Sequence, residues 1–174
     1  MNKFSYYKHI VLSKLTKNGS ESLVRAFRKE GMVIGNGCHI FSNILLSEPY
    51  LIKIGNNCTI STNVNFITHD ASIGLYMGRN KFSDICGRIE IGNNCFIGNG
   101  AILLYGISLP DNTLVAAGSV VTKSFVELGN IIAGNPAKVV GKIQDYLERN
   151  KDLFLSLHGL TAEERINKYY ITIR

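Results

Sequence analysis

Hydrophobic residues return at every sixth position through the middle of the chain. From Ile34 onward the sequence divides into hexapeptides such as IGNGCH, IGNNCT, IGNNCF and IGNGAI. A helix would need apolar residues at a spacing of 3.6, and hairpin strands would alternate with a spacing of two. A period of six fits neither pattern and predicts a solenoid, in which each hexapeptide forms one short strand and a corner and three hexapeptides close a coil. The first positions are aliphatic or Phe: Ile34, Ile40, Leu46, Ile54, Ile60, Phe66, Ile91, Ile97, Leu103, Leu109, Val115 and Val121.

The remaining positions of the unit agree with this prediction. The second to fourth places collect Gly, Asn and Asp, which tolerate the positive φ that a corner needs. The fifth place is often small, at Cys38, Cys58, Val64, Cys95, Ala101, Thr113 and Ser119. Three of the four cysteines therefore read as packing residues in a narrow corner, and the C-x-x-C spacing of a metal site is absent. The fourth, Cys86, falls in a gap between repeats and reads as a loop residue.

The two ends of the chain have a helical pattern, with apolar residues three and four apart. We expect a helical segment over residues 1–30 that Gly31 terminates, and a helical tail over residues 144–174 in which Thr161 and Glu164 form a capping box. Between them, residues 31–143 form the predicted solenoid domain. Residues 72–90 cannot be divided into hexapeptides and are predicted to be an inserted loop, and long loops in compact domains are usually functional.

Composition narrows the possible partners. The 174 residues are 45% hydrophobic and 18% charged, which is typical of a globular protein of one domain. No apolar run approaches the roughly 20 residues of a membrane span, and the start of the chain has no secretory signal pattern, so we expect a cytoplasmic protein. The net charge of +6 comes from scattered Lys and Arg without a basic stripe, which argues against nucleic-acid binding but suits a phosphorylated small molecule.

One titratable pair stands where the repeat breaks, in the stretch NFITHD. His69 occupies the fourth position of its unit, on the outside of a corner, so it is predicted to lie outside the core. It is either a surface residue or a general base, because imidazole titrates near neutral pH and a carboxylate can orient it. The other histidines, His9, His39 and His158, are predicted to be surface groups.

Taken together, IGNNC, IGNGA, the THD before the loop and the closing VAAGSVVTKSFVELGNIIAGNPAKVV resemble the hexapeptide-repeat acyltransferases. The resemblance extends from Gly31 to about Lys142, and its branch is that of maltose, galactoside, xenobiotic and capsular-sugar O-acetyltransferases. The segment SEPYLIKIG is similar to the variety found in polysaccharide and lipopolysaccharide biosynthesis. The resemblance implies an all-β, left-handed parallel β-helix, a homotrimer, and acetyl-CoA bound between neighbouring subunits.

The same resemblance implies roles for individual residues. His69 matches the catalytic histidine, and Phe96 stands where many members have Trp against the pantetheine arm. The other implied cofactor contacts are Asn99, Ala117, Thr122, Lys123 and Lys138. The acceptor contacts are expected among Asn43, Glu48, Asp70 and Asp84. Tyr105 replaces a frequent corner Pro, and Gly141 stands where some relatives have a second Arg.

These residues predict an acetyl-CoA-dependent O-acetyltransferase that acts on a sugar or glycan precursor by direct transfer, with His69 as general base and no metal. An antibiotic O-acetyltransferase and an amino-sugar N-acyltransferase are the alternatives within the same chemistry. A covalent route through Cys86 or Ser72 has no base at an interpretable spacing. A metal-dependent hydratase would need an H-x-x-x-x-H spacing that the chain lacks, and a non-catalytic solenoid would not require THD, the loop and VVTK together.

Overall fold

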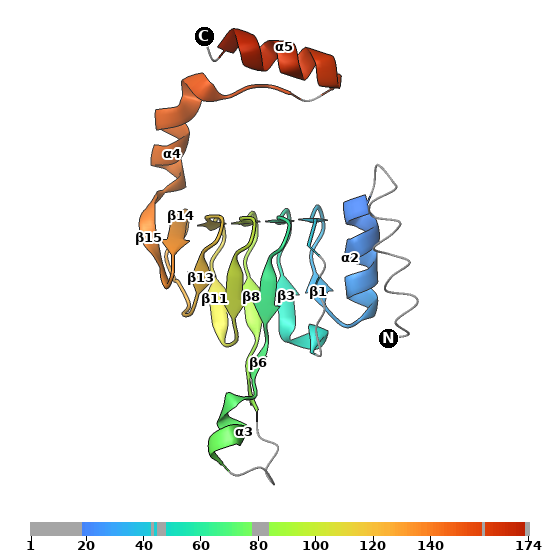
Figure 1. Ribbon diagram of the computed structural model, residues 1–174, viewed down its shortest axis with the longest axis vertical. Coiled ribbons are helices and arrows are strands. Elements are labelled where there is room, and N and C mark those ends of the chain that lie inside the picture. The colour runs from blue at the N-terminus through green and yellow to red at the C-terminus, as the bar shows by residue number, and fades with distance from the viewer. Residues whose placement is uncertain (1–18, 43, 45–47, 78–83, 158, 173–174) are drawn as a thin grey trace. The chain divides into compact units, whose positions relative to one another are not determined.

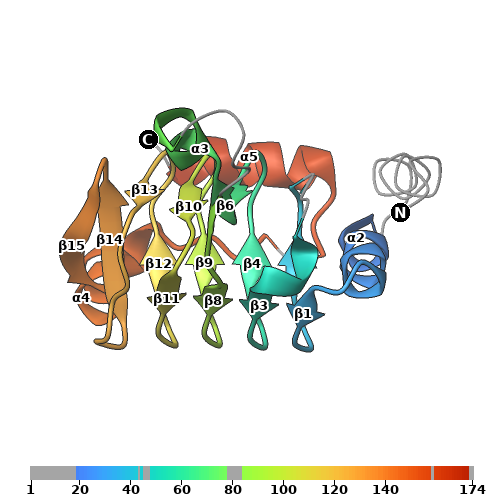
Figure 2. The same ribbon diagram turned by 90° about the horizontal axis from the view of Figure 1, so that it is seen from below.

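The chain coils into a stack of short strands that line up in three sheets, and three successive turns each contribute one strand to every sheet. The computed structural model describes residues 19–42, 44, 48–77, 84–157 and 159–172. These residues belong to two compact units, Met1–Ile143 and Gln144–Arg174. Figures 1 and 2 show the coils of the first unit side by side, with helix α2 (Gly19–Lys29) beside the first coil.

The three sheets follow the hexapeptide period. In spatial order the first contains β1 (Val33–Ile34), β3 (Ile52–Ile54), β8 (Ile89–Ile91) and β11 (Ile107–Leu109). The second contains β2 (His39–Ile40), β4 (Thr59–Ile60), β9 (Phe96–Ile97), β12 (Leu114–Val115), β14 (Asn130–Gly134) and β15 (Ala137–Lys142). The third contains β5 (Asn65–Ile67), β10 (Ile102–Leu104) and β13 (Val120–Val121). All neighbours in these sheets are parallel except β14 and β15, which form an antiparallel end to the stack.

The inside of the stack is filled by the two positions that the repeat selects. Every described first-position residue is buried, which confirms the predicted pattern; Leu46 lies outside the described residues. The small fifth-position residues are buried as well, including the three cysteines predicted to pack there. Each of these thiols also lies against a backbone carbonyl of the next coil, as Cys58 Sγ does at 3.1 Å from Gly92 O. The core is therefore one continuous column of Ile, Leu, Val and small side chains.

Asparagine turns the corner between the first and second sheets. Asn57, Asn94 and Asn112 occupy the same place in successive coils, with φ of 56°, 55° and 57°. Asn pays less strain than most residues in this left-handed region, because its short polar side chain can hydrogen-bond locally. Gly55, two residues before Asn57, is needed for another reason: a Cβ there would lie 2.7 Å from the carbonyl oxygen of Gly92 in the next coil. The coils thus approach too closely at this corner for any side chain at that position.

A ladder of side-chain hydrogen bonds runs along the same corner. The backbone N–H of Asn36 donates to Asn56 Oδ1 at 2.8 Å, and that of Asn56 donates to Asn93 Oδ1 at 2.8 Å. Asn93 donates from its backbone to Asp111 Oδ1 at 2.7 Å and from its amide to Asp111 Oδ2 at 3.0 Å. Each rung satisfies a corner N–H that no strand partner reaches. The ladder therefore ties four consecutive coils together and ends on a carboxylate.

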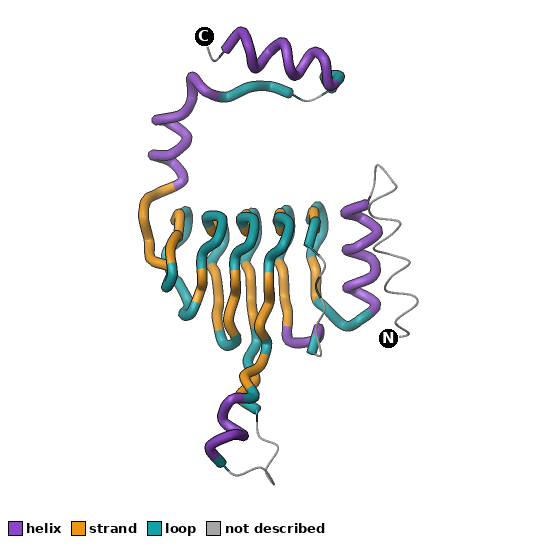
Figure 3. Tube along the Cα trace, in the orientation of Figure 1, coloured by secondary structure: helices purple, strands orange, loops and turns teal. Residues whose placement is uncertain are grey.

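The predicted loop is an insertion that leaves the stack after the third sheet, and its residues 78–83 lie outside the described ranges. It begins with β6 (His69–Asp70), continues through α3 (Ser72–Tyr76) and returns as β7 (Ile85–Cys86), which pairs antiparallel with β6. Figure 3 shows this ribbon projecting from the stack with α3 beyond it. The sequence placed the end of the loop too late: Ile89 and Glu90 already belong to β8, paired with Ile52 and Lys53 of β3. Ile89, two positions before the unit that begins at Ile91, packs inward, so the strand begins earlier than the hexapeptide count predicts.

Helix α2 covers the open end of the first coil. Its residues Leu23, Val24 and Phe27 are buried with the solenoid core, and Gly31 follows the helix at φ 102°. The first half of the predicted helical segment, including His9, lies outside the described residues. A short 3-10 turn, η1 (Pro49–Leu51), leads into β3.

The second unit consists of helices with little buried surface. Helix α4 (Ile143–Asn150) starts at the last residue of the first unit, and the 3-10 turn η2 (Lys151–Leu153) and α5 (Ala162–Thr172) follow it. The predicted capping box at the start of α5 is confirmed: the Thr161 N–H donates to Glu164 Oε2 at 2.7 Å, and the Glu164 N–H donates to Thr161 Oγ1 at 3.2 Å. Among the described residues, no helix is both long and apolar enough to cross a membrane.

The ladder makes a stability prediction for Asp111→Asn. The backbone N–H and side-chain amide of Asn93 hold the pKa of Asp111 below its ordinary value. A depressed pKa in the folded state stabilises the fold above the unfolded pKa of about 4, and this contribution is lost as the pH falls through the folded pKa. Asn accepts the backbone bond but not the amide bond, so the variant should have a lower Tm at pH 7. The deficit should shrink as the pH falls to about 3. Thermal unfolding of both proteins across this range tests it, and a constant deficit would contradict the assignment.

Candidate active site

A carboxylate from one coil meets the imidazole of the next at the base of the insertion. Glu48 directly precedes η1, and His69 opens β6. His69 Nδ1 lies 2.9 Å from Glu48 Oε2, with the two side chains 38% and 19% exposed. Because a carboxylate accepts, Nδ1 carries the proton in this pair and Nε2 of a neutral ring keeps its lone pair. The imidazole lies outside the core, as predicted from its position in the repeat.

Thr68 donates a second hydrogen bond to the same carboxylate oxygen of Glu48. Its hydroxyl donates to Glu48 Oε2 at 2.7 Å, and its side chain is buried. Burial by itself would raise the pKa of Glu48, but the hydrogen bonds from Thr68 and His69 outweigh it and leave that pKa below its ordinary value. Glu48 is therefore ionised at neutral pH. A fixed anion at Nδ1 selects one tautomer of His69 and one orientation of its ring.

Asp70, next to His69, makes one contact within the insertion and one with the following coil. Asp70 Oδ1 accepts the backbone N–H of Ser72 at 2.8 Å, and Asp70 Oδ2 lies 3.5 Å from the Tyr105 hydroxyl. Hydrogen bonds from Ser72 are the main reason that the pKa of Asp70 is lowered. Gly87 ends the ribbon where a Cβ would lie 2.6 Å from Gly106 N. The ribbon that carries His69 thus stands between Glu48 of the preceding coil and Tyr105 of the following one.

The predicted cofactor residues fall into two groups. Asn99 and Ala117 lie at the corner between the second and third sheets, where the Gly118 N–H donates to Asn99 O at 2.8 Å. The Asn99 amide donates to Thr62 Oγ1. Phe96 projects from the outer face of the second sheet and is 45% exposed, in register with Leu114. These three residues therefore lie along one side of the stack.

The second group lies at the far end of the stack. Lys123 and Lys138 line one pocket of about 420 Å³ between the turn after β13 and the β14–β15 hairpin. Asn130 also lines it; its amide N–H donates to Glu127 O at 3.1 Å, while its buried Oδ1 has no partner among the described residues. Lys142 pairs with Glu127 at 3.0 Å, and this contact lowers the pKa of Glu127. Thr122, exposed, precedes Lys123. Two lysines that line one pocket, with no ion-pair partner for either among the residues that the structure describes, suit a phosphate-bearing ligand.

The predicted acceptor residues have different surroundings. Glu48 is bound to His69 and Thr68, and Asp70 is held within the insertion. Asp84 is exposed just before β7, and Asn43 lies outside the described residues. The sequence did not identify the partnership of Glu48 with His69, nor the roles of Thr68 and Tyr105. The one available signal was their separation of 20 residues, which is close to the length of three hexapeptides, that is, one coil.

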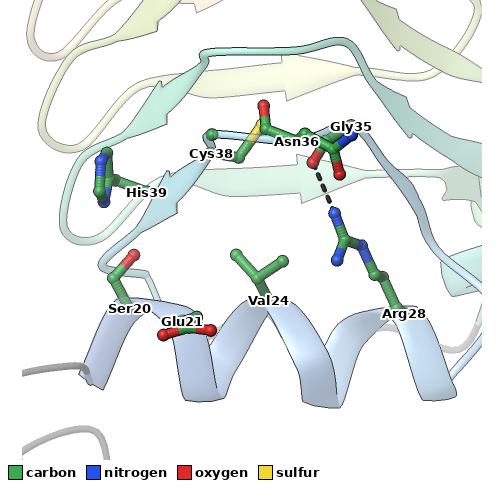
Figure 4. A pocket seen from close by; sticks show the side chains of 9 residues that line it. Ser20, Glu21, Val24, Arg28, Gly35, Asn36, Cys38 and His39 are labelled. Atoms are coloured by element: carbon green, nitrogen blue, oxygen red, sulfur yellow. Dashed lines mark hydrogen bonds between the residues drawn. The ribbon is translucent and has the colours of Figure 1, made fainter.

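A further pocket of about 440 Å³ lies between α2 and the first coil (Figure 4). Arg28 crosses it and donates from Nε to Ile34 O at 3.0 Å and from Nη2 to Gly35 O at 2.6 Å. Ser20 Oγ accepts the Ile40 N–H at 2.7 Å at the opposite end. These bonds join α2 to the strands of the first coil, so the pocket belongs to the contact between this helix and the end of the stack. Among the described residues, no three His, Cys, Asp or Glu side chains are grouped to hold a metal ion.

Comparisons with known proteins agree with this architecture. The family model described as "Hexapeptide repeat of succinyl-transferase" matches residues 88–123. Protein CapG of Staphylococcus aureus is 43% identical over 144 residues, which cover 80% of this chain and 80% of CapG. Galactoside O-acetyltransferase of Escherichia coli (strain K12) is 31% identical over 114 residues. The matched region covers 64% of this chain and about half (54%) of that protein's length.

Solved structures share the fold. A maltose O-acetyltransferase from Clostridium difficile 630 aligns with a TM-score of 0.54 at 26% identity, over 79% of this chain and 86% of that one. A galactoside acetyltransferase in complex with coenzyme A aligns with a TM-score of 0.59 at 21% identity, over 91% and 90% of the two chains. Given the repeat, the stacked sheets and a relative 43% identical across four fifths of its length, this chain belongs to the hexapeptide-repeat family of acyltransferases.

Proposed function

We propose that this protein transfers an acetyl group from acetyl-CoA to a hydroxyl of a sugar or glycan precursor, with His69 as general base. The observation that carries the proposal is the contact of 2.9 Å between His69 Nδ1 and the ionised Glu48. It leaves Nε2 free to accept a proton, which is what a base for hydroxyl attack requires.

The proposed reaction is a direct transfer. Nε2 of His69 removes the acceptor's proton as its oxygen attacks the thioester carbonyl, and Glu48 stabilises the imidazolium that forms. The tetrahedral intermediate then collapses, the C–S bond breaks, and the imidazolium returns the proton to the CoA sulfur. No acyl-enzyme is needed, and a base of this kind is worth roughly 10² to 10⁴ in rate.

The donor would be held by the two groups of cofactor residues. Lys123 and Lys138, with Thr122, would bind the phosphates of CoA in the pocket that the two lysines line. Phe96 would contact the pantetheine arm, and Asn99 and Ala117 would offer polar and backbone contacts along it. Support comes from membership in a family of acetyltransferases and from the exposure of Phe96, Lys123 and Lys138.

A sugar hydroxyl is the acceptor that the relatives favour. The maltose O-acetyltransferase is 26% identical to this chain and the galactoside O-acetyltransferase is 31% identical. Asn43, Asp70 and Asp84 stay predicted acceptor contacts, whereas we assign Glu48 to orienting His69. The SEPYLIKIG segment that contains Glu48 is the part that resembles enzymes of polysaccharide biosynthesis. Four cysteines without disulfides suit a reducing compartment, so we propose a cytoplasmic enzyme.

We further propose that the coils wind left-handed and that three chains form a trimer through contacts between the outer faces of their sheets. The outward residues Lys53, Glu90 and Ser108 of the first sheet are polar, and Val33 on β1 is its exposed apolar exception. The second and third sheets instead expose apolar side chains such as Phe96 and Ile67. A cyclic assembly would bury the second sheet of one copy against the third sheet of the next, because a ring repeats one heterologous contact.

The catalytic assignment predicts that His69→Ala folds normally and lowers kcat about 10²- to 10⁴-fold. Acetyl transfer is measured by chromatographic detection of CoA and acetylated product, with acetyl-CoA and a panel of glycosides, nucleotide sugars, amino sugars and streptogramins. His39→Ala is the matched control, because His39 is an exposed histidine that stacks on Phe41 away from the insertion. An unchanged kcat in His69→Ala would remove the general base; preference for amines would favour N-acylation.

A double-mutant cycle extends this prediction to Glu48. Glu48→Gln keeps the size of the side chain but loses the charge that orients the ring, so kcat should fall roughly 10²-fold while the KM for acetyl-CoA is unchanged. In the His69→Ala background the same substitution should cost nothing more in kcat, because it acts through the imidazole. Additive losses would instead indicate that Glu48 contacts the acceptor directly.

The donor assignment predicts that Lys123→Ala and Lys138→Ala each raise the KM for acetyl-CoA about tenfold, as expected for the loss of one charge-assisted hydrogen bond. Their kcat should be unchanged, because neither residue is near His69 in sequence or in the described contacts. Raising the salt concentration should weaken donor binding more in the wild type than in either variant. Lys53→Ala is the control. An equal rise of the KM for acetyl-CoA in that variant would show that the net charge of the protein, not these two lysines, determines donor binding.

The assembly predicts a particle of three chains of 19.2 kDa by light scattering. Phe96→Glu would place an ionised group in the proposed contact and should release monomers, since burying an unpaired charge is costly. Glu90→Lys on the first sheet is the control and should stay trimeric. A wild-type monomer at micromolar concentration with full activity would contradict a site shared between copies.

A further inference from the structure

Cys86 stands directly opposite His69 in the ribbon that carries the imidazole. The β6–β7 ladder pairs His69 with Cys86 and Asp70 with Ile85. The N–H of Gly87 donates to Thr68 O at 3.0 Å, which makes Thr68 and Gly87 a hydrogen-bonded pair. Because such pairs alternate, His69 and Cys86 form the non-hydrogen-bonded kind, in which opposite side chains stand closest, with Cβ atoms about 4.5–5.5 Å apart.

The ribbon therefore has two chemically different faces. Side chains alternate along a strand, so His69 and Cys86 share one face while Asp70 and Ile85 share the other. The second face is occupied in part by the Asp70 contact with Tyr105. On the first face, Glu48 takes only the Nδ1 side of the imidazole. Cys86 is therefore the cross-strand neighbour of His69 on the face where Nε2 lies unbound to Glu48.

Cys86 also differs from the other cysteines in its surroundings. Cys38, Cys58 and Cys95 are buried in the column of the core, and burial raises the pKa of the Cys38 thiol. Cys86 is exposed in a two-stranded ribbon that has no core of its own. Packing therefore does not determine the residue at this position, and a small side chain there keeps the approach to the imidazole open.

We propose that Cys86 is a specificity-determining residue, whose side chain forms one wall of the acceptor site and limits the size of the hydroxyl compound that reaches His69. This inference rests on the proposed function, since it assigns the acceptor to the face that His69 and Cys86 share. The donor would then approach from the other side of the imidazole. A larger group at position 86 should obstruct the acceptor and leave donor binding as it was.

Thiol modification tests this directly, because Cys86 is the one exposed thiol among the four cysteines of the chain. Methyl methanethiosulfonate adds a thiomethyl group to Cys86 and releases methanesulfinate, and dithiothreitol reverses the modification. We expect the modified trimer to lose about tenfold or more in kcat/KM for the acceptor, as a misfitted pocket does. Acetyl-CoA affinity by calorimetry should be unchanged, and dithiothreitol should restore turnover.

Two variants serve as controls. The rate of Cys86→Ala should be the same with and without reagent. Cys86→Ala combined with Lys53→Cys offers an exposed thiol on the first sheet, and its modification should not change the rate. In a size series, Cys86→Phe should lower the kcat/KM ratio of disaccharide to monosaccharide acceptor about tenfold relative to Cys86→Ala.

The outcomes separate this inference from the proposed function. A wild type that acetylates no member of the acceptor panel would overturn the proposed function itself. If the wild type is active, full turnover after complete modification would overturn the role of Cys86 alone. A modified enzyme that no longer binds acetyl-CoA would also overturn it, because position 86 would then face the donor. Loss of acceptor turnover with intact donor binding is the result that supports the proposal.

Discussion

The parallel hydrogen bonding between coils is the constraint on which the rest of the structure depends. Each strand is only two to six residues long, so no strand could hold its place alone. Stacking gives each corner and each strand a partner in the coils before and after it, and residues in the same place of the repeat come to lie in rows. The Asn36–Asn56–Asn93–Asp111 ladder is one such row. Another row begins where β5 and β10 of the third sheet end, and it contains Thr68 and Tyr105. Thr68 bonds to Glu48, and Tyr105 contacts Asp70 from the following coil.

The site follows from that stacking because its parts come from different coils. Glu48 and His69 are 21 residues apart in sequence, yet one coil brings the carboxylate to 2.9 Å from the imidazole. One carboxylate oxygen accepts both Thr68 and His69, so the anion is fixed by a buried hydroxyl that belongs to the core corner. An imidazole on a narrow projecting ribbon would otherwise sample several rotamers. A rigid acceptor at Nδ1 removes that freedom before substrate binds, and such preorganisation is what general-base catalysis needs.

The sequence predicted what repeats and missed what does not. First- and fifth-position burial followed from the period alone, because the interior of a narrow prism admits one large and one small side chain per unit. The boundary at residue 90 was wrong because Ile89 lies two positions before the hexapeptide and packs inward without belonging to the counted unit. The separation of Glu48 and His69 is close to one coil, but it did not identify their contact. Ile52 and Lys53 interrupt the hexapeptide count between them, and the period does not fix where a side chain on the projecting ribbon points. Lys123 and Lys138 were identified by resemblance, and their meeting in one pocket depends on the β14–β15 hairpin turning back on the stack.

The place of the insertion explains how the ribbon that carries His69 can be added without disturbing the core. Asn56 and Asn93 are corresponding residues of the coils on either side of the insertion, and they are 37 residues apart in sequence. Asn93 and Asp111, with no insertion between them, are 18 residues apart. Both pairs nevertheless form equivalent rungs of the ladder. Closing a longer loop costs little, because the entropy grows only with the logarithm of its length and a doubling costs about 0.6 kcal/mol. The register of β3 with β8 is therefore unaffected by what the insertion contains. In the proposed site, Cys86 and Asp84 could therefore vary with the acceptor, while Thr68 and Glu48 hold His69 in place.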